Sequence, residues 1–383
     1  MKKIIRITTI SNSLCYLLKG QLKYMGQFYE MVGVSGKGES LGLVEKNENA
    51  RIHAIEMTRS ITPIQDLIAT YKLYKFFKRE QPFVVHTHTP KAGTLGMLAA
   101  KIAGVPNRVH TIAGLPLLEA KGVKRTLLNN VERLTYKCST HVLPNSFELK
   151  RTILDLKFTS NEKLSVIANG SSNGIDEQHY DVRNISESKK SELRQKLKID
   201  NSDIVFIYLG RIVKDKGINE LVVAFDRLSR TYPKSKLLIV GPREDDLDPI
   251  SNTSEEIIKK NNSIIVPGAQ TDIRPFVAIS NVLAFPSYRE GFPNVVLQAS
   301  CMGLPCIVSN INGCNEIITD KENGLVIPPK NEEALYNAMK FMIENPDCRT
   351  KMSLGSRENI VNKYQQSLVW NELLKFYRSL EES

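Results

Sequence analysis

Two cations in the second half of the sequence stand in one short loop between apolar runs. Arg211 and Lys216 follow a predicted strand that ends at Gly210, and a predicted helix begins near Ile218. Two fixed cations beside a helix N-terminus form a site for a diphosphate. For this segment alone, solvated loop charges explain the pattern equally well.

A carboxylate stands in a second loop of the same kind. Glu290 lies between a predicted strand that ends at Pro286 and a predicted helix that begins near Pro293. Gln298 follows two turns later, on about the same side of the chain. Gly291 carries no side chain, so backbone N–H groups beside Glu290 can meet a ligand. Pro293 by itself indicates only an ordinary helix start.

A third polar loop, Asn312–Ile317, follows the predicted strand Pro305–Ser309. A lone Glu at such a place, here Glu316, most simply caps the next helix.

The segment His86–Thr94 is the corresponding polar loop of the first half. We expect His86 and His88 to point to opposite faces of a strand, where they are poorly placed to share a metal ion. No metal site is therefore expected. Lys91 lies in a strand-to-helix loop, where it either meets a phosphate or is simply exposed.

Short apolar strands alternate with amphipathic helices along both halves of the chain, which predicts parallel βαβ units. The predicted strands are Lys3–Thr9, Val32–Ser35, Phe83–Thr87, Arg108–Thr111, His141–Pro144, Ile204–Leu209, Lys236–Val240, Ser263–Val266, Val282–Pro286, Pro305–Ser309 and Gly324–Ile327. The clearest predicted helices are residues 14–25, Ile64–Arg79, Gly93–Ile102, Val123–Lys137 and Leu221–Arg230. In such sheets ligands bind at the carboxyl ends of the strands, where all four polar loops lie.

The length of 383 residues predicts two domains. A segment rich in Asn, Gly and Ser, Asn169–Asp176, precedes a polar stretch over 181–200. We therefore expect two doubly wound α/β domains, at 1–175 and 195–365. A C-terminal amphipathic helix within 366–383, which carries the only tryptophan, Trp370, is expected to pack back on the first domain.

The net charge of +11 is unevenly distributed. Residues 1–190 hold 28 basic and 16 acidic residues (28 − 16 = +12), and the remainder hold 24 and 25 (24 − 25 = −1). Basic residues alternate with apolar ones in Tyr71–Arg79, and a second basic cluster is Lys121–Arg125. These segments suit an anionic membrane surface or a polyphosphate, or else form a solvated surface. No nucleic-acid-binding motif accompanies the charge, so no nucleic acid partner is expected.

Targeting signals and cysteine patterns are not apparent. Arg6 interrupts the apolar start, and prolines and amides interrupt the longest uncharged run, Gly291–Asn315. None of the six cysteines forms a CxxC pair, which favours reduced thiols over a zinc site. We expect a cytoplasmic protein.

Together, Gly210–Gly217, Glu290–Gln298 and Gly313–Glu316 resemble the GT-B glycosyltransferases, specifically the retaining family 4 that includes capsule and lipopolysaccharide sugar transferases. The phrases His86–Gly93 and Gly104–Thr111 look like the same family. The resemblance covers nearly the whole chain, and its C-terminal motifs are the more specific ones.

The resemblance implies that Arg211 and Lys216 bind the diphosphate of a nucleotide sugar and offset the charge on the leaving nucleotide, with no metal ion and no cofactor. It places Glu290 at the donor sugar, in a cleft between the two domains. The implied donor-binding residues are Gly210, Gly291, Phe292, Pro293, Asn294, Gln298, Gly313 and Glu316. Candidates for contact with the acceptor or its phosphate are Ser13, Lys91 and His110. The reaction implied is same-face substitution with retention, or a route through a transient covalent intermediate.

Two positions depart from the family pattern. The second acidic residue of the motif usually holds the nucleotide ribose, and here it is Gln298, which accepts a hydrogen bond without charge assistance. Many relatives place a His before a Gly where this chain has Ala113 and Gly114, and His110 stands three residues earlier.

The basic first domain is expected to take a lipid-diphosphate-linked sugar at the inner face of the plasma membrane, with UDP-sugar as the expected donor. Two alternatives stay open. One is a UDP-sugar 2-epimerase of the same fold, against which the Arg211, Lys216 and Glu290 loops argue. The other is a non-catalytic binder of nucleotide sugars or nucleic acid, which Gln298 and Ala113 favour slightly.

Overall fold

The computed structural model describes residues 1–58, 60–244 and 248–382, and the chain divides into two compact units. Unit 1 comprises Met1–Gly174 and Gln366–Ser383, and unit 2 comprises Ile175–Gln365. The polar stretch after residue 175 belongs to unit 2, where it forms η4 (Val182–Asn184) and α7 (Glu187–Lys196).

Unit 1 is built on a six-stranded parallel sheet with the strand order β3-β2-β1-β4-β5-β6. Its strands are β1 (Lys3–Ile7), β2 (Glu30–Ser35), β3 (Arg51–Ala54), β4 (Val84–His88), β5 (Asn107–Ile112) and β6 (His141–Pro144). Ile4 and Ile5 belong to two different apolar clusters, which shows that the sheet is covered on both faces. This explains why its strands read as continuous apolar runs.

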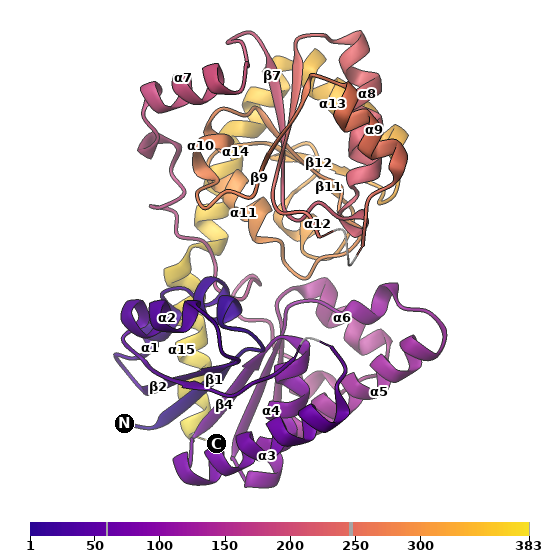
Figure 1. Ribbon diagram of the computed structural model, residues 1–383. Coiled ribbons are helices and arrows are strands. Elements are labelled where there is room, and N and C mark those ends of the chain that lie inside the picture. The colour runs from indigo at the N-terminus through magenta and orange to yellow at the C-terminus, as the bar shows by residue number, and fades with distance from the viewer. Residues whose placement is uncertain (59, 245–247, 383) are drawn as a thin grey trace. The chain divides into compact units, whose positions relative to one another are not determined.

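The helices of unit 1 form two layers on this sheet. They are η1 (Ser13–Leu17), α1 (Gln21–Met25), α2 (Ser40–Glu48), α3 (Pro63–Glu80), α4 (Pro90–Ala103), η2 (Pro116–Glu119), α5 (Gly122–Cys138), α6 (Phe147–Asp155), η3 (Asn161–Lys163) and α15 (Gln366–Glu382). Helix α4 packs between α3 and α5 on one face (Figure 1). Helix α15 contributes Leu373 and Tyr377 to the cluster on the other face.

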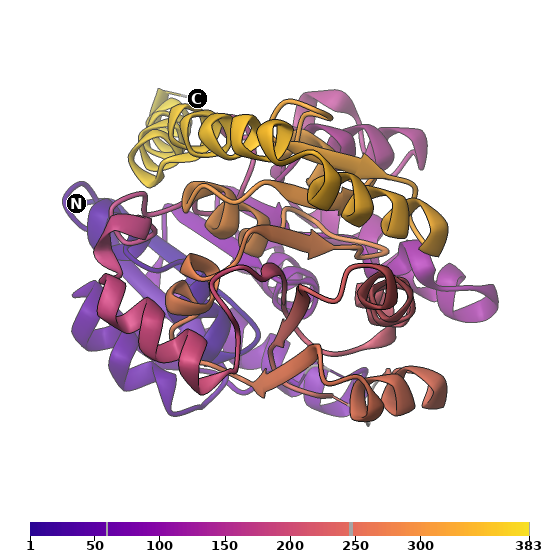
Figure 2. The same ribbon diagram turned by 90° about the horizontal axis from the view of Figure 1, so that it is seen from above.

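Unit 2 repeats the architecture, with the strand order β12-β11-β10-β7-β8-β9. Its strands are β7 (Ile204–Leu209), β8 (Ser235–Val240), β9 (Ile264–Gly268), β10 (Val282–Phe285), β11 (Cys306–Ser309) and β12 (Gly324–Ile327). Its further helices are η5 (Lys214–Lys216), α8 (Ile218–Thr231), α9 (Asn252–Lys260), α10 (Arg274–Ala278), α11 (Asn294–Cys301), α12 (Cys314–Ile317), α13 (Glu332–Glu344) and α14 (Pro346–Tyr364). Helix α8 packs against α9 and α13, α11 packs against α14, and Figure 2 shows helices on both faces of the sheet.

The predicted doubly wound α/β fold is confirmed, and every predicted strand overlaps an observed one. Two local predictions are wrong. The predicted helix over residues 14–25 is a π-helical turn and a separate helix, divided at Gly20, whose φ is +80°. The predicted elements also omit α2 and β3, which lie between the predicted strand Val32–Ser35 and the predicted helix Ile64–Arg79, in a stretch whose glycines and charges concealed them.

Candidate active site

The strand order gives each sheet one point at which the chain reverses its direction of winding. In unit 2 this point lies between β7 and β10, which pair directly. Ligands of doubly wound folds bind outside the carboxyl ends of the strands at such a point. Arg211 and Lys216 follow β7, and Glu290 follows β10. The topology therefore brings the loops that the sequence singled out to one place.

Lys216 and Glu290 are in direct contact across this point. The Lys216 Nζ lies 2.5 Å from Glu290 Oε1, and Ser287 Oγ donates a hydrogen bond of 2.8 Å to the same oxygen. The side chains of Lys216 and Glu290 are each only 15% exposed. Burial strengthens the ion pair. Both contacts are made to Oε1, and the second carboxylate oxygen, Oε2, can accept a hydrogen bond from a ligand.

Further contacts fix the two loops to one another. Arg289 donates to the carboxylate of Asp215 at 2.8 Å, and the Tyr288 N–H donates to the Asp215 carbonyl at 3.0 Å. The Tyr288 hydroxyl donates to Glu220 Oε1, in the first turn of α8, at 2.6 Å. The loop that carries Lys216 and the loop that carries Glu290 therefore form one preorganised structure.

Arg211 is the second predicted cation and is more accessible. Its Nη1 lies 2.6 Å from Glu244 Oε2, and its side chain is 41% exposed. The Tyr208 hydroxyl donates to the Arg211 carbonyl at 2.8 Å, which holds the backbone at the end of β7. In this state both cations are neutralised by a carboxylate, so an anionic ligand must compete with Glu244 and Glu290.

The loop after β11 packs on the backbone of the Glu290 loop. Asn312 Nδ2 donates to the carbonyls of Glu290 and Gly291, the latter at 3.3 Å. Gly313 has φ +78°, and a Cβ at this position would lie 2.3 Å from the Gly291 carbonyl oxygen. Only glycine allows this approach.

The remaining predicted donor residues of unit 2 lie around these loops. Gln298 Nε2 donates to the Tyr180 hydroxyl at 2.8 Å, and burial raises the pKa of Tyr180 to about 12. Phe292 is buried against Tyr364, with ring centroids 5.3 Å apart. Glu316 lies in the first turn of α12, as expected of a helix-capping carboxylate. Gly210 directly follows β7 and has φ +144°, while Pro293 is the N-cap of α11 and Asn294 its first residue.

The acceptor candidates belong to unit 1, whose own reversal point lies between β1 and β4. Ser13 follows β1 and Lys91 follows β4. Lys91 is not the exposed cation that one interpretation allowed: its side chain is 13% exposed, and its Nζ lies 2.6 Å from Asp66 Oδ2.

His110, the third acceptor candidate, lies in β5 and is only 3% exposed. Its Nδ1 lies 2.8 Å from Thr87 Oγ1, and a Cβ on Gly93 would come within 2.3 Å of its Cε1. Burial lowers the pKa of His110 to about 4, so the imidazole is neutral at pH 7. The structure gives His110 a packing role beside α4.

The prediction that His86 and His88 point to opposite faces is wrong. Their rings stack at 4.4 Å between centroids, because residues two apart on a strand share a face. His86 Nδ1 lies 2.6 Å from the Tyr377 hydroxyl, and His88 Nε2 accepts from the buried guanidinium of Arg6 at 3.1 Å. Burial lowers the pKa of both imidazoles well below its ordinary value. Among the described residues, no group of three or more His, Cys, Asp or Glu side chains is placed to hold a metal ion.

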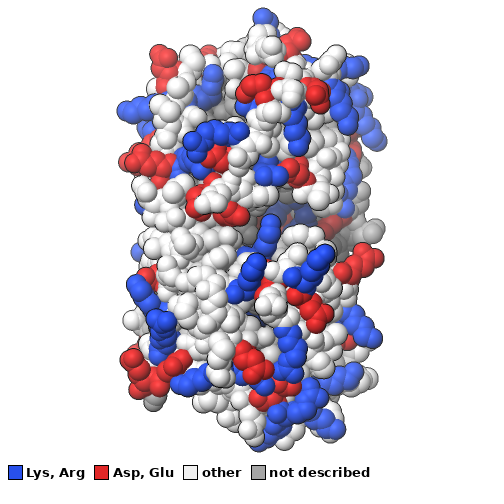
Figure 3. Space-filling model, turned by 90° about the vertical axis from the view of Figure 1, so that its left-hand side faces the viewer, with Lys and Arg blue, Asp and Glu red and all other residues white. Residues whose placement is uncertain are grey.

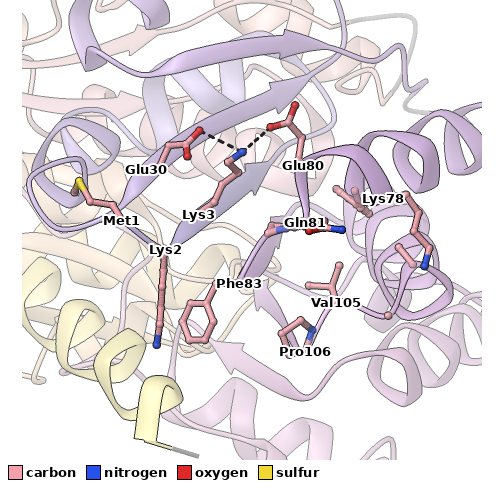
Figure 4. A pocket seen from close by; sticks show the side chains of 14 residues that line it. Met1, Lys2, Lys3, Glu30, Lys78, Glu80, Gln81, Phe83, Val105 and Pro106 are labelled. Carbon is pink, nitrogen blue, oxygen red and sulfur yellow. Dashed lines mark hydrogen bonds and ion pairs between the residues drawn. The ribbon is translucent and has the colours of Figure 1, made fainter.

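A further pocket lies at the opposite edge of the unit 1 sheet, at the amino ends of β1 and β4 (Figure 4). Its volume is about 650 Å³. Lys3 lies between Glu30 at 3.3 Å and Glu80 at 2.8 Å, and Glu80 is also bound by Arg51. Hydrogen bonds from Arg51 and Lys3 lower the pKa of Glu80 to about 2. These charges compensate one another, and the edge is not the one that binds ligands in this fold.

Comparisons with known proteins agree with this geometry. The family model for glycosyl transferases group 1 matches residues 189–359, and that for the glycosyl transferase 4-like domain matches residues 31–170. The capsular polysaccharide biosynthesis glycosyltransferase CapM of Staphylococcus aureus is 32% identical over 100% of this chain and 98% of its own length. This chain belongs to the family 4 GT-B glycosyltransferases. It is an enzyme of the glycosyltransferase class.

Two further relatives are informative. A UDP-Gal:alpha-D-GlcNAc-diphosphoundecaprenol alpha-1,3-galactosyltransferase of Escherichia coli is 30% identical over 80% of this chain and 78% of its own. The crystal structure of Anabaena HepE in complex with UDP and glucose superposes with a TM-score of 0.83 at 17% identity, covering 99% of this chain and 100% of that one. The structural neighbour supports the GT-B fold.

Proposed function

We propose that this glycosyltransferase moves a sugar from a UDP-sugar to a lipid-diphosphate-linked or glycan acceptor, with retention and without a metal ion, in surface polysaccharide synthesis. The observation that carries the proposal is the Lys216–Glu290 pair at the reversal point of unit 2, with Arg211 beside it. Lys216 and Arg211 can bind a diphosphate, and the Glu290 carboxylate can accept hydrogen bonds from sugar hydroxyls. Groups for both the diphosphate and the sugar of the donor therefore lie on adjacent loops.

In the proposed donor complex the diphosphate takes over the cations. Lys216 leaves Glu290 for a phosphate oxygen, and Arg211 leaves the more exposed Glu244. Glu290 is then free to accept hydrogen bonds from the sugar hydroxyls while Ser287 holds its Oε1. Gln298 faces the ribose through its amide oxygen, because its amide nitrogen is engaged by Tyr180.

In the proposed reaction the acceptor hydroxyl oxygen forms a bond to the anomeric carbon on the face from which the diphosphate leaves. The bond between the anomeric carbon and the phosphate oxygen breaks with its electron pair going to the nucleotide. A phosphate oxygen takes the acceptor proton. Lys216 and Arg211 stabilise the charge that develops on the diphosphate, the type of contribution for which preorganised cations are most effective.

The lipid-linked acceptor is proposed from the relatives and from the surface of unit 1. The Escherichia coli relative is named for a diphosphoundecaprenol acceptor, and a Campylobacter jejuni relative that is 25% identical is named for a diphospho-undecaprenol acceptor. Fourteen large hydrophobic side chains are exposed in the described part of the chain, and eight of them lie within residues 61–71 and 123–134. Exposed apolar groups gathered in this way mark an interaction surface.

Basic residues accompany these apolar groups on α3 and α5, where Lys72, Lys75 and Lys124 are exposed. The face drawn in Figure 3 carries lysine and arginine side chains with acidic ones between them. Within residues 1–58, 60–244 and 248–382, no helix has the length and hydropathy needed to cross a membrane. We propose peripheral association of the α3–α5 surface with the anionic inner face of the plasma membrane.

Thermal shift with UDP-, GDP-, ADP- and TDP-sugars, with EDTA or magnesium, tests the donor site. A ligand at 100 times its dissociation constant stabilises the folded state by about 2.7 kcal/mol. We expect a rise in melting temperature only with UDP-sugars, equal in EDTA and magnesium, and clearly smaller in Lys216→Ala. A rise that requires magnesium, or that is equally large in Lys216→Ala, contradicts the proposal.

Sedimentation with vesicles that contain anionic lipid tests the membrane surface. The double variant Ile64→Ser, Leu67→Ser should bind less, because these side chains are among the most exposed apolar groups of α3. The matched control is Leu354→Ser, which removes an equally exposed apolar side chain from unit 2. Equal binding by the wild type and the double variant would contradict this assignment.

A further inference from the structure

An apolar cavity that opens to solvent lies in the α3–α5 surface of unit 1. Its volume is about 200 Å³, and it lies between the segment before α3, the first turns of α4, η2 and α5. Six side chains form its apolar wall: Ile61, Leu95, Leu117, Leu127, Leu128 and Val131. We call it the α4–α5 cavity.

One part of this cavity is polar. Lys91, Asp66, Thr94 and Glu132 line it, and Lys91 lies in the first turn of α4, three residues after the carboxyl end of β4. Lys91 is paired with Asp66, while Glu132 is buried and its pKa is raised by burial. The cavity therefore has a long apolar wall and a polar end beside the edge of the sheet at which ligands bind.

The surroundings of the cavity continue the same pattern. Ile61 and Leu127 both line the cavity and are exposed, so the apolar wall reaches the surface. Arg125 donates to the carbonyl of the lining residue Leu117 at 2.6 Å, and Lys121 and Lys124 are exposed one turn away. A hydrocarbon chain with an anionic head matches this combination of an apolar channel and basic neighbours.

The volume decides between a whole ligand and a part of one. Ordinary ligand pockets measure about 300–1,000 Å³, and this cavity is smaller. It suits a short segment of chain whose remainder lies elsewhere, for example in a bilayer beneath the exposed residues of α3 and α5.

We propose that the α4–α5 cavity binds the diphosphate-proximal isoprene units of a polyprenyl diphosphate acceptor. The proposal rests on the proposed function for its acceptor class. It adds that the enzyme binds the isoprenoid chain of the acceptor, in addition to the saccharide and the diphosphate, and that the site for this chain lies within unit 1.

Isothermal titration with farnesyl diphosphate and with inorganic diphosphate isolates the contribution of the chain, because both probes carry the same head. Each buried methylene group contributes about fourfold to affinity, so three of them give about 50-fold. We expect farnesyl diphosphate to bind at least about 50-fold more tightly than inorganic diphosphate. Leu128→Trp, which fills the cavity, should remove most of this ratio without changing the binding of inorganic diphosphate.

Two further variants guard against misfolding and nonspecific adsorption. Ile61→Ser alters the mouth at a side chain that is 63% exposed, so folding is preserved, and the ratio should fall at least about fourfold. Ile102→Ser removes a comparably exposed apolar side chain at the other end of α4 and should leave the ratio unchanged. Equal affinities for the two probes, an unchanged ratio in both cavity variants, or an equal loss in Ile102→Ser would each overturn the proposal.

The result is separable from the proposed function. Sugar transfer to a lipid-diphosphate acceptor, with no preference for farnesyl diphosphate over diphosphate, overturns the cavity proposal and leaves the function standing. Binding of farnesyl diphosphate with these variant effects, but no sugar transfer to any lipid-diphosphate acceptor, supports the cavity and overturns the proposed function.

Discussion

Replacing Glu290 by Gln should make UDP bind more tightly while making the enzyme slower. Lys216 Nζ lies 2.5 Å from Glu290 Oε1, so a diphosphate must break this ion pair before it can use the cation. Gln keeps the size of the side chain and the acceptor for Ser287 but removes the charge. The competing interaction is therefore weakened in the free enzyme.

The magnitude follows from the exposure of the pair. Fully exposed pairs contribute about 0.2–1 kcal/mol. The side chains of Lys216 and Glu290 are each 15% exposed, so we expect their ion pair to contribute about 1 kcal/mol or somewhat more. Its loss should tighten UDP binding by about fivefold. The catalytic rate constant should fall by about 100-fold, because a charged acceptor at the donor sugar is lost.

Titration calorimetry with UDP and steady-state kinetics measure the two effects, and three variants complete the test. Lys216→Ala should weaken UDP binding by about 10- to 100-fold, the contribution of a charge-assisted hydrogen bond. Lys214→Ala makes the same substitution at an exposed lysine on the same turn and should have little effect. Glu333→Gln, a surface carboxylate paired with Arg227, controls for the change in net charge. Weaker UDP binding in Glu290→Gln than in the wild type would refute the competition between carboxylate and diphosphate.

Three further predictions concern stability and are measured by urea denaturation. Gly313→Ala should lower the free energy of unfolding by at least about 2 kcal/mol, because it combines a left-handed φ with a clash against the Gly291 carbonyl. The control is Gly42→Ala in α2, which has nothing within 4 Å of its added Cβ and should be neutral or stabilising. Equal effects of the two substitutions would contradict the argument. The pKa of Glu80 is lowered from 4.5 to about 2, so its contribution to folding stability is complete above pH 4.5 and is lost as the pH falls towards 2. Glu80→Gln should therefore flatten the pH dependence of the free energy of unfolding between about pH 4.5 and 2. An unchanged slope in this range would refute the argument. Tyr377→Phe removes the hydroxyl bound to His86 and Arg6 and should cost about 1–3 kcal/mol, and a neutral variant would show that these buried groups find other partners.

The loops of the proposed donor site were predictable from sequence because each is a local signal. Arg211, Lys216 and Glu290 each stand between an apolar strand and a helix start, and the parallel topology then places all strand ends on one edge. Their pairing was not predictable in the same way. Lys216 and Glu290 are 74 residues apart, and only the adjacency of β7 and β10 brings them into contact.

Other contacts of the candidate sites involve segments in which the sequence pattern indicated no functional residue. The partner of Gln298 is Tyr180, which lies between the two predicted domains, 1–175 and 195–365. The ion pair between Lys91 and Asp66 joins the start of α4 to the first turn of α3. Lys91, for which the sequence suggested an exposed loop position as one possibility, is therefore largely shielded from solvent. The α4–α5 cavity is formed by side chains from four separate segments, and no single motif signals it.

The most direct test of the central claim is an assay of sugar transfer with the product's anomeric configuration determined by NMR. The purified chain is incubated in EDTA with a UDP-sugar and a lipid-diphosphate-linked sugar acceptor. We expect a product enlarged by one sugar, joined through the same anomeric configuration as in the donor, with no turnover in Lys216→Ala. An inverted linkage, a requirement for a metal ion, or conversion of the UDP-sugar without any acceptor would contradict it.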